Sequence, residues 1–248
     1  MEIGGYQKVT LKDYPGKVAA ICFTQGCQLR CPYCHNPDLV LKERFVTETE
    51  QEKITEDFFS YVLKRKNLLD GVVFSGGEPL LQADLQEVLY QLKNEGFSIK
   101  LDTNGLLPNL LKDLVTKGLI DYVALDYKSN FSGWHKATGI ESTQSKESQY
   151  IQWQKSLRIL DQYSVPYELR TTVVKGIHRR DDLMGMGKDL NALIKKSAPK
   201  WFLQRFEKSQ MVLSDYKTGG IVPLAYSRGE MTEICKDLHQ IMPTVQLR

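Results

Sequence analysis

Three cysteines stand close together in the first part of the chain: Cys27, Cys31 and Cys34. Their Cys-x-x-x-Cys-x-x-Cys spacing follows a short apolar run, which predicts a loop that brings three thiolates to one site. Ligation by thiolates alone selects zinc, Cu(I) or an iron–sulfur cluster. A structural zinc ion takes four protein ligands. A 4Fe–4S cluster normally has four cysteine ligands, so three would leave one iron open to another ligand.

No other residue is an obvious fourth ligand. Cys22 lies inside the apolar run, Cys235 lies far along the chain, and His35 directly follows Cys34. An adjacent cysteine and histidine can bind one ion only through an awkward loop, and the two remaining cysteines are predicted to be packing residues. A zinc site and three unrelated buried cysteines remain open as alternatives.

The cysteine spacing, with an aromatic residue just before the last cysteine, resembles the radical S-adenosylmethionine (SAM) superfamily. In that family SAM chelates the open iron, and the reduced cluster cleaves SAM to a 5′-deoxyadenosyl radical. The resemblance implies a 4Fe–4S cluster on Cys27, Cys31 and Cys34, with SAM as the second cofactor. It also implies that Tyr33 shields the cluster and faces the adenine.

A second motif, Ser75-Gly76-Gly77-Glu78-Pro79, ends the second predicted strand. Paired glycines let the backbone approach a ligand closely, and a carboxylate suits an ammonium group. By resemblance, Gly76, Gly77 and Glu78 hold the amine of the SAM methionine.

The residues around these motifs narrow the resemblance. His35-Asn36 looks like the glycyl-radical-enzyme activases, and Asp102-Thr103 and Asp126-Tyr127-Lys128 resemble pyruvate formate-lyase activating enzymes. The resemblance implies a monovalent cation bound by Asp102, Thr103 and Asp126, and a contact between Lys128 and the methionine end of SAM. Alternatively, the two aspartates only cap loops at strand ends.

Two further cofactor contacts are predicted on later strands. Arg170 is a charge in an apolar strand, which is costly unless it is paired. By resemblance it reaches the carboxylate or ribose of SAM; a salt bridge with Glu168 or another carboxylate is the alternative. Gln204 is a candidate contact to adenine or ribose, and it departs from the histidine of formate-lyase activases.

The segment Val9–Lys17 resembles the short activases of anaerobic (class III) ribonucleotide reductase. This likeness implies abstraction of a glycine Cα hydrogen from a client enzyme, with a flavodoxin or ferredoxin-type electron donor. Alternatives are the activase of another glycyl radical enzyme such as pyruvate formate-lyase, and a small-molecule radical SAM enzyme such as 7-carboxy-7-deazaguanine synthase. A zinc-binding interaction module is the non-enzymatic alternative.

Strand and helix patterns alternate along the chain. Strands are predicted at Val18–Phe23, Gly71–Phe74, Ser98–Asp102, Tyr122–Asp126, Tyr167–Val174 and Trp201–Arg205. Helices are predicted at Thr49–Lys66, Asp84–Glu95, Pro108–Lys117, Glu147–Gln162 and Asp181–Lys196, and from Ser227 to about Ile241. Six β-then-α units predict an α/β fold with a parallel sheet, an incomplete (β/α)6 TIM-like barrel of the radical SAM type.

The units suggest one radical SAM domain over residues 1–248. It comprises an N-terminal segment (1–17), a core barrel (18–206) and a C-terminal part (207–248) with a connection, a helix and a possible edge strand at Thr244–Leu247. The polar stretch Ser129–Ser148 is expected to be a loop, and His135 and His178 are expected to be solvated loop histidines.

Composition sets outer limits on function. The 248 residues carry 33 Lys and Arg against 30 Asp and Glu, a net charge of +3 that predicts no nucleic-acid partner. No signal peptide and no membrane-length apolar run is recognisable. Five cysteines in a chain of this length do not suggest a secreted disulfide scaffold. We therefore expect a cytoplasmic protein with reduced thiols and no membrane partner.

Overall fold

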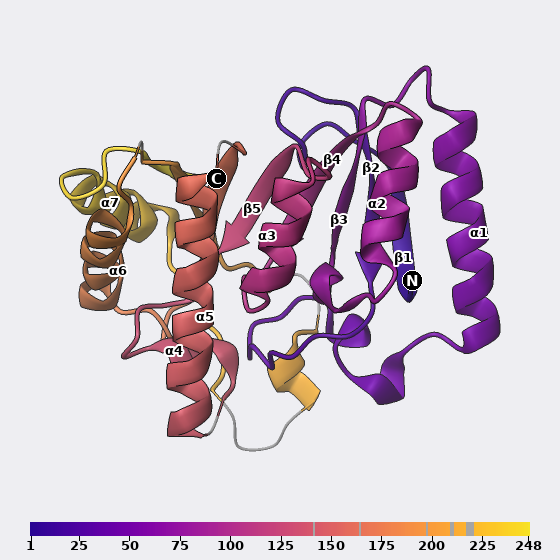
Figure 1. Ribbon diagram of the computed structural model, residues 1–248. Helices are drawn as coiled ribbons and strands as arrows, with labels where there is room; N and C mark the ends of the chain where they lie inside the picture. Colours follow the sequence, from indigo (N-terminus) through magenta and orange to yellow (C-terminus); the bar gives the residue numbers. More distant parts are fainter. Residues whose placement is uncertain (141, 164, 197, 209–210, 217–220) are drawn as a thin grey trace. The chain divides into compact units, whose positions relative to one another are not determined.

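The computed structural model describes residues 1–248 except 141, 164, 197, 209–210 and 217–220 (Figure 1). These residues form two compact units. The first unit comprises Met1–Gln28, Asp38–Thr103 and Asn109–Ala124, and the second comprises Leu29–Pro37, Asn104–Pro108 and Leu125–Arg248. Strands pair in chain order, from β1 to β8, and the sheet is not closed. The predicted α/β fold with an incomplete barrel is therefore confirmed.

Four strands belong to the first unit: β1 (Ile3–Thr10), β2 (Ala19–Thr24), β3 (Gly71–Gly76) and β4 (Ser98–Thr103). Strand β1 runs antiparallel to β2, whereas β2, β3 and β4 are parallel. Thr24 stands opposite Gly76, and Phe74 stands opposite Leu101. The carboxyl ends of the three parallel strands therefore meet at one edge, where the predicted site residues follow them.

The sequence did not predict β1. Only its end residues, Ile3 and Thr10, are buried, and the stretch Gln7–Val9 is exposed. The alternation of apolar and polar residues that identifies a half-buried strand is therefore weak. Pairing with β2 makes this segment a strand, which is a tertiary effect.

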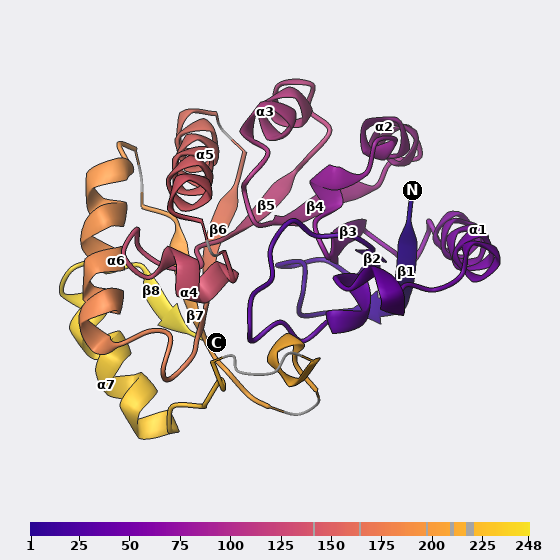
Figure 2. The ribbon, with the colours of Figure 1, turned by 90° about the horizontal axis from the view of Figure 1, so that it is seen from below.

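Three helices of the first unit cover one side of its strands, as Figure 2 shows for α1 (Glu48–Lys64), α2 (Leu85–Asn94) and α3 (Pro108–Thr116). A capping box between Thr47 and Glu50 begins α1. Helix α1 also packs on β1, with the rings of Tyr6 and Phe58 5.5 Å apart. All three helices agree with the predicted ranges to within two residues.

The second unit carries the later strands and four helices. Strand β5 (Tyr122–Asp126) crosses the boundary between the units, and β6 (Tyr167–Val173), β7 (Lys200–Arg205) and β8 (Val245–Leu247) are parallel. The helices are α4 (Trp134–Thr138), α5 (Thr143–Gln162), α6 (Arg180–Leu193) and α7 (Arg228–His239). A capping box between Ser227 and Glu230 begins α7, and β8 lies where the sequence offers a possible edge strand.

The prediction of a loop over Ser129–Ser148 is wrong in part, because α4 and the beginning of α5 lie there. Two glycines of this stretch are the boundaries of α4. Gly133 is its N-cap, and Gly139 ends it with a left-handed φ of 71°. Glycine is favoured in that conformation because it lacks a Cβ.

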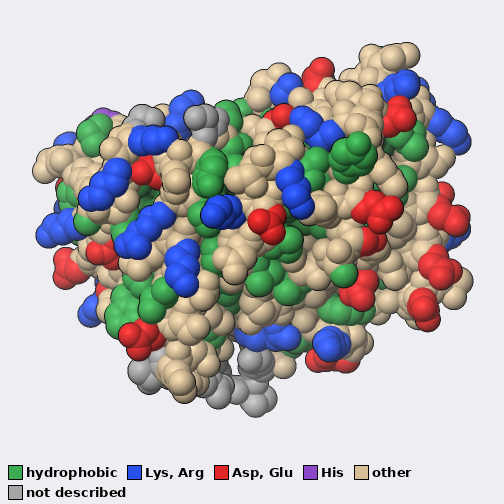
Figure 3. Space-filling model, in the orientation of Figure 1, with side chains coloured by type: hydrophobic (Ala, Val, Ile, Leu, Met, Phe, Trp, Pro, Cys, Tyr) green, Lys and Arg blue, Asp and Glu red, His purple; other side chains and the backbone are tan. Residues whose placement is uncertain are grey.

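Charged side chains of both signs are spread over the face shown in Figure 3. This agrees with the nearly equal numbers of basic and acidic residues in the sequence. Among the described residues, no helix combines the length and the apolar character needed to cross a bilayer. Cys22 is fully buried in β2, as expected for a packing residue.

Candidate active site

In the first unit, the segment after β3 packs against the backbone just before Cys27. The Gly77 amide donates to the Thr24 carbonyl at 2.8 Å. A Cβ on Gly76, whose φ is +110°, would lie 2.4 Å from the Thr24 nitrogen. A Cβ on Gly77 would lie 2.1 Å from the carbonyl oxygen of Gly26. Both glycines are therefore required by close backbone packing, which fixes the start of the cysteine loop.

Glu78 is fully buried at the end of β3. Its Oε1 accepts from the Thr103 hydroxyl at 2.7 Å and from the Leu80 amide at 3.2 Å. The carboxylate thus begins the short 3₁₀ helix Pro79–Leu81 and joins the ends of β3 and β4. These contacts hold two predicted site residues, Glu78 and Thr103, in one hydrogen-bonded pair.

Asp102 forms an ion pair with Lys100, a residue that the sequence reasoning missed. The Lys100 side chain is only 1% exposed, and Asp102 is 9% exposed. The Ser75 hydroxyl donates to the second carboxylate oxygen of Asp102 at 3.1 Å. Residues two apart in a strand share a face, so the pairing of Lys100 with Asp102 was a signal available in the sequence.

In the second unit, Cys31 and Cys34 lie in one tight turn, because the Cys34 amide donates to the Cys31 carbonyl at 3.0 Å. The chain after β7 returns to this turn: the Leu213 amide donates to the Cys34 carbonyl at 3.1 Å, and the Ser214 amide to the Pro32 carbonyl at 3.0 Å. The distant segment around Leu213 and Ser214 therefore holds the backbone of the turn that carries the two cysteines.

Helix α4 contacts the residue that precedes this turn, Arg30. The Arg30 amide donates to the Thr138 carbonyl at 2.9 Å. A Cβ on Gly139 would lie 2.1 Å from the Arg30 carbonyl oxygen. The unpredicted helix thus has a role in positioning the cysteine loop.

Tyr33, between the two cysteines, is 4% exposed. Its hydroxyl is buried and has no hydrogen-bond partner among the described residues. Burial raises the pKa of Tyr33, and the nearby Cys31 adds to this effect. A buried hydroxyl without a partner is costly, so this atom fits a contact with a bound group.

Asp126, Lys128 and Arg170 form one charged cluster beside Cys31 and Tyr33. The Lys128 ammonium lies 2.9 Å from Asp126 Oδ2, and Arg170 donates to Oδ1 from Nε at 3.2 Å and from Nη2 at 3.1 Å. Burial acts to raise the pKa of Asp126, but the two cations outweigh burial and hold this pKa below its usual value. Burial opposes the charge of Lys128, but Asp126 and then Cys31 raise its pKa well above the usual range.

His178 is fully buried, so the expectation of a solvated histidine is wrong there. The Val174 amide donates to Nδ1 at 3.1 Å, and Nε2 lies 2.7 Å from the Lys128 carbonyl, to which it must donate. Burial lowers the pKa of His178, and the neutral ring is the form that accepts at Nδ1 while it donates from Nε2. The ring thereby fixes the backbone of Lys128 and contacts Tyr33 edge-on, with 6.2 Å between ring centres.

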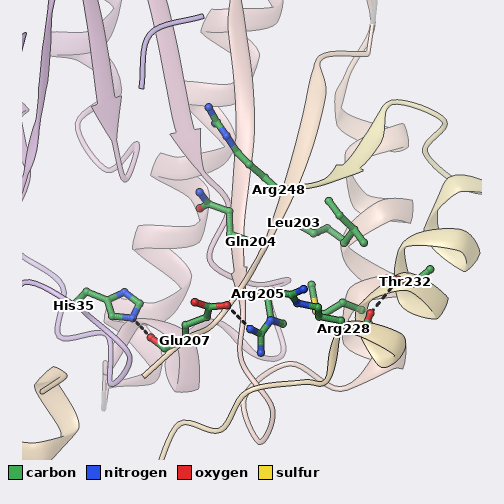
Figure 4. Close-up of a pocket in the computed structure, with 10 residues that line it drawn as sticks. His35, Leu203, Gln204, Arg205, Glu207, Arg228, Thr232 and Arg248 are labelled. Carbon is green, nitrogen blue, oxygen red and sulfur yellow. Dashed lines mark hydrogen bonds and ion pairs between the residues drawn. The ribbon is translucent and has the colours of Figure 1, made fainter. Parts of the chain in front are cut away.

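Gln204 lines a cavity of about 770 Å³ bordered by β7, β8 and α7 (Figure 4). His35 lies at its edge: Nε2 is 2.9 Å from the Glu207 carbonyl, and its ring stacks on Phe206 at 5.3 Å. The cavity is thus next to the cysteine loop within the second unit.

Cys27 belongs to the first unit, and Cys31 and Cys34 to the second. Within each unit, the described residues include no group of three His, Cys, Asp or Glu side chains that could hold a metal ion. The joint ligation of one cluster by all three cysteines therefore stays a prediction from their spacing.

Known proteins resemble this chain along most of its length. The radical SAM superfamily profile matches residues 21–177. The chain is 30% identical over 250 residues to a protein of Methanocaldococcus jannaschii provisionally named a glycyl-radical enzyme activating enzyme, covering 99% of this chain and 95% of that protein. It is 32% identical over 192 residues to the pyruvate formate-lyase-activating enzyme of Staphylococcus aureus, covering 73% and 72%.

Solved structures agree on the fold. Streptococcus suis SuiB bound to S-adenosylmethionine matches with a TM-score of 0.59 at 13% identity, covering 90% of this chain and 47% of SuiB. At this identity the likeness concerns the fold alone.

Proposed function

Because the chain belongs to the radical SAM superfamily and is homologous to glycyl-radical enzyme activating enzymes, we propose that it activates an anaerobic ribonucleotide reductase. The reaction is removal of one Cα hydrogen atom from a glycine of that client protein. The class of enzyme follows from the family; the identity of the client is the proposal.

The choice of client rests on the segment Val9–Lys17. The archaeal relative that matches 99% of this chain is named only as a glycyl-radical enzyme activating enzyme, so its name indicates no client. Residues Val9–Lys17, which resemble reductase activases, lie at the end of β1 and in the turn that follows. In that turn the Thr10 hydroxyl contacts the Asp13 carboxylate, and Tyr14 is buried. The likeness of this segment to reductase activases is what supports the choice of client.

The family implies a 4Fe–4S cluster and SAM. Cys27, Cys31 and Cys34 would hold the cluster, and the three-thiolate donor set fits it. The unpartnered buried hydroxyl of Tyr33 fits a bound group on the same loop. When bound and reduced, this pair of cofactors supplies the hydrogen-abstracting 5′-deoxyadenosyl radical.

The protein's own residues bind and orient the cofactor in this proposal. Gly76, Gly77 and Glu78 hold the methionine amine. Asp126 positions the cationic side chains of Lys128 and Arg170, which face the carboxylate of the SAM methionine.

Further features belong to the proposal. Gln204 contacts the adenine or ribose of SAM. The chain acts as one radical SAM domain in the cytoplasm, and it takes its electron from a flavodoxin or a ferredoxin-type protein. No nucleic acid or membrane takes part.

Pyruvate formate-lyase is the second candidate client, because its activase in S. aureus is 32% identical to this chain over 192 residues. The experiment that separates the two uses anaerobically reconstituted protein, SAM and a chemical reductant. Each candidate client is added in turn, and a glycine-centred doublet is sought by electron paramagnetic resonance. We expect the doublet with the reductase. A doublet with formate-lyase alone would overturn the choice of client.

A further inference from the structure

The cavity bordered by β7, β8 and α7 has a cationic lining. Arg205, Arg228 and Arg248 contribute three guanidinium groups, against a single carboxylate from Glu207 (Figure 4). Arg205 pairs with Glu207, and Arg248 lies 3.2 Å from Glu168, which is 1% exposed. Arg228, the first residue of α7, forms no ion pair within the described residues. Positive charge therefore exceeds negative charge in this lining.

The rest of the lining is apolar or hydrogen-bonding. Leu203, Met231 and Leu247 supply aliphatic surface, and Gln204 supplies an amide. Of the lining residues, His35 alone carries a ring, and Phe206 covers one face of it. The guanidinium groups suit a carboxylate, and the aliphatic side chains suit the residues on either side of it.

The cavity is also continuous with the cysteine loop. His35 directly follows Cys34 and bonds to the backbone of Glu207, which lies just after β7. A polypeptide segment seated in the cavity would therefore lie beside the loop that carries two predicted cluster ligands.

We propose that this cavity binds an acidic segment of the client polypeptide, with an aspartate or glutamate side chain directed at Arg228 and Arg205. This inference rests on the proposed function and adds the chemistry by which the client is recognised. A volume of about 770 Å³ is large enough for several side chains. Guanidinium groups favour carboxylates because they can bind them with two parallel hydrogen bonds.

The test compares two charge reversals on one helix. Arg228→Glu changes the cavity, whereas Lys236→Glu makes the same change on an exposed residue two turns further along α7. An acidic residue is favoured in the first turn of a helix, so Arg228→Glu should fold, which thermal melting will verify. Affinity for an anaerobic ribonucleotide reductase is measured by calorimetry with the reconstituted protein.

We expect Arg228→Glu to weaken client binding about tenfold at low salt, and Lys236→Glu to change it less than about twofold. Added salt should weaken the wild type more than Arg228→Glu. Equal client affinity of both variants would overturn the proposal. If the wild type binds no client and forms no glycyl radical, the proposed function fails instead.

A second inference comes from the buried pair of Lys100 and Asp102 in the first unit. The resemblance to formate-lyase activases implies a monovalent cation at Asp102, yet a chain ammonium already pairs with this carboxylate. The Lys100 nitrogen also lies 6.0 Å from the ring centre of Tyr122, and Ser75 fills a further acceptor site of Asp102. A second cation at this carboxylate would be repelled by the ammonium.

We infer that the ammonium group of Lys100 takes the place of a monovalent ion beside Asp102. Lys100 is then a positioning residue, which keeps Asp102 in place at the end of β4. SAM binding by this protein should not depend on sodium or potassium.

The experiment measures SAM affinity of the reconstituted protein in sodium, potassium and choline chloride. The wild type should bind equally in all three, within about twofold. Lys100→Met should bind more tightly in sodium or potassium than in choline, because Asp102 then lacks its cation. The inference would be overturned if SAM affinity of the wild type depended on potassium or sodium. It would also be overturned if SAM affinity of Lys100→Met were the same in all three salts.

Two control variants accompany this experiment. Lys93→Met removes a lysine whose ammonium lies 2.7 Å from Asp121 in a partly exposed pair, and it should create no salt dependence. The double variant Lys100→Met/Asp102→Asn removes both buried charges, which proteins often tolerate better than a broken pair. It should fold and also show no preference among the three salts.

Discussion

Tyr33 has a buried hydroxyl for which the described residues offer no hydrogen bond. Such a group costs about 1–3 kcal/mol in a folded protein. We expect Tyr33→Phe to stabilise the cluster-free protein by about 1 kcal/mol, measured by urea unfolding. In the reconstituted protein the same change should weaken SAM binding several-fold, because a polar contact is lost.

Tyr167 provides the matched control, since its hydroxyl is also buried without a described partner. Tyr167→Phe should stabilise the cluster-free protein to a similar extent and leave SAM affinity as it was. If Tyr33→Phe destabilises the cluster-free protein, its hydroxyl already has a partner in the chain, and the proposed cofactor contact loses its support.

The Asp126 carboxylate links the cations of Lys128 and Arg170. Because its pKa is lowered on folding, its contribution to stability is complete above the unfolded value of about 3.9 and is lost as pH falls through the lower folded value. Asp126→Asn leaves two cations without their anion and should cost about 2 kcal/mol at pH 7.

Urea unfolding at a series of pH values checks this prediction. The difference between wild type and Asp126→Asn should be constant from about pH 7 to 5 and shrink below about pH 4. A difference that grows on acidification would contradict the ion-pair account of this cluster.

At the scale of elements, α4 holds the cysteine loop through its last turn. Gly139→Ala would place a Cβ 2.1 Å from the Arg30 carbonyl oxygen, at a φ of +71°. We expect destabilisation by more than about 1 kcal/mol and a lower iron content after reconstitution, because the loop between Cys27 and Cys34 shifts. Iron and sulfide analysis under anaerobic conditions measures the effect.

Gly118→Ala is the control for backbone strain alone. Gly118 has a similar φ of +67°, and a Cβ there would meet nothing within 4 Å. Its substitution should reduce stability but not iron content. Equal iron loss in the two variants would show that α4 does not position the cysteine loop.

The elements also show where sequence reasoning succeeded. Long amphipathic helices such as α1 and α7 carried capping boxes, and the apolar runs of β2 to β7 were clear, so their positions were predictable. Strand β1 and helix α4 were not, because β1 depends on pairing with β2, and α4 is a five-residue helix between two glycines. His178 gains its role only through burial, whereas the i, i+2 spacing of Lys100 and Asp102 was a signal that the sequence reasoning missed.

At the scale of the whole molecule, the sequence motifs and the family agree on radical SAM chemistry. Client choice depends on features that motifs describe poorly: the β1 segment, which belongs to the first unit, and the cationic cavity of the second unit. Both lie outside the motifs shared by radical SAM enzymes, so they are where activases for different clients can differ.

Activation of the client is tested most directly by following the hydrogen atom that leaves its glycine. The anaerobic ribonucleotide reductase is prepared with glycine deuterated at Cα and mixed with the reconstituted protein, SAM and reductant. The account predicts that deuterium appears in the 5′-deoxyadenosine, detected by mass spectrometry, in step with growth of the glycine-centred doublet. 5′-Deoxyadenosine free of deuterium, with no radical on the client, would contradict it.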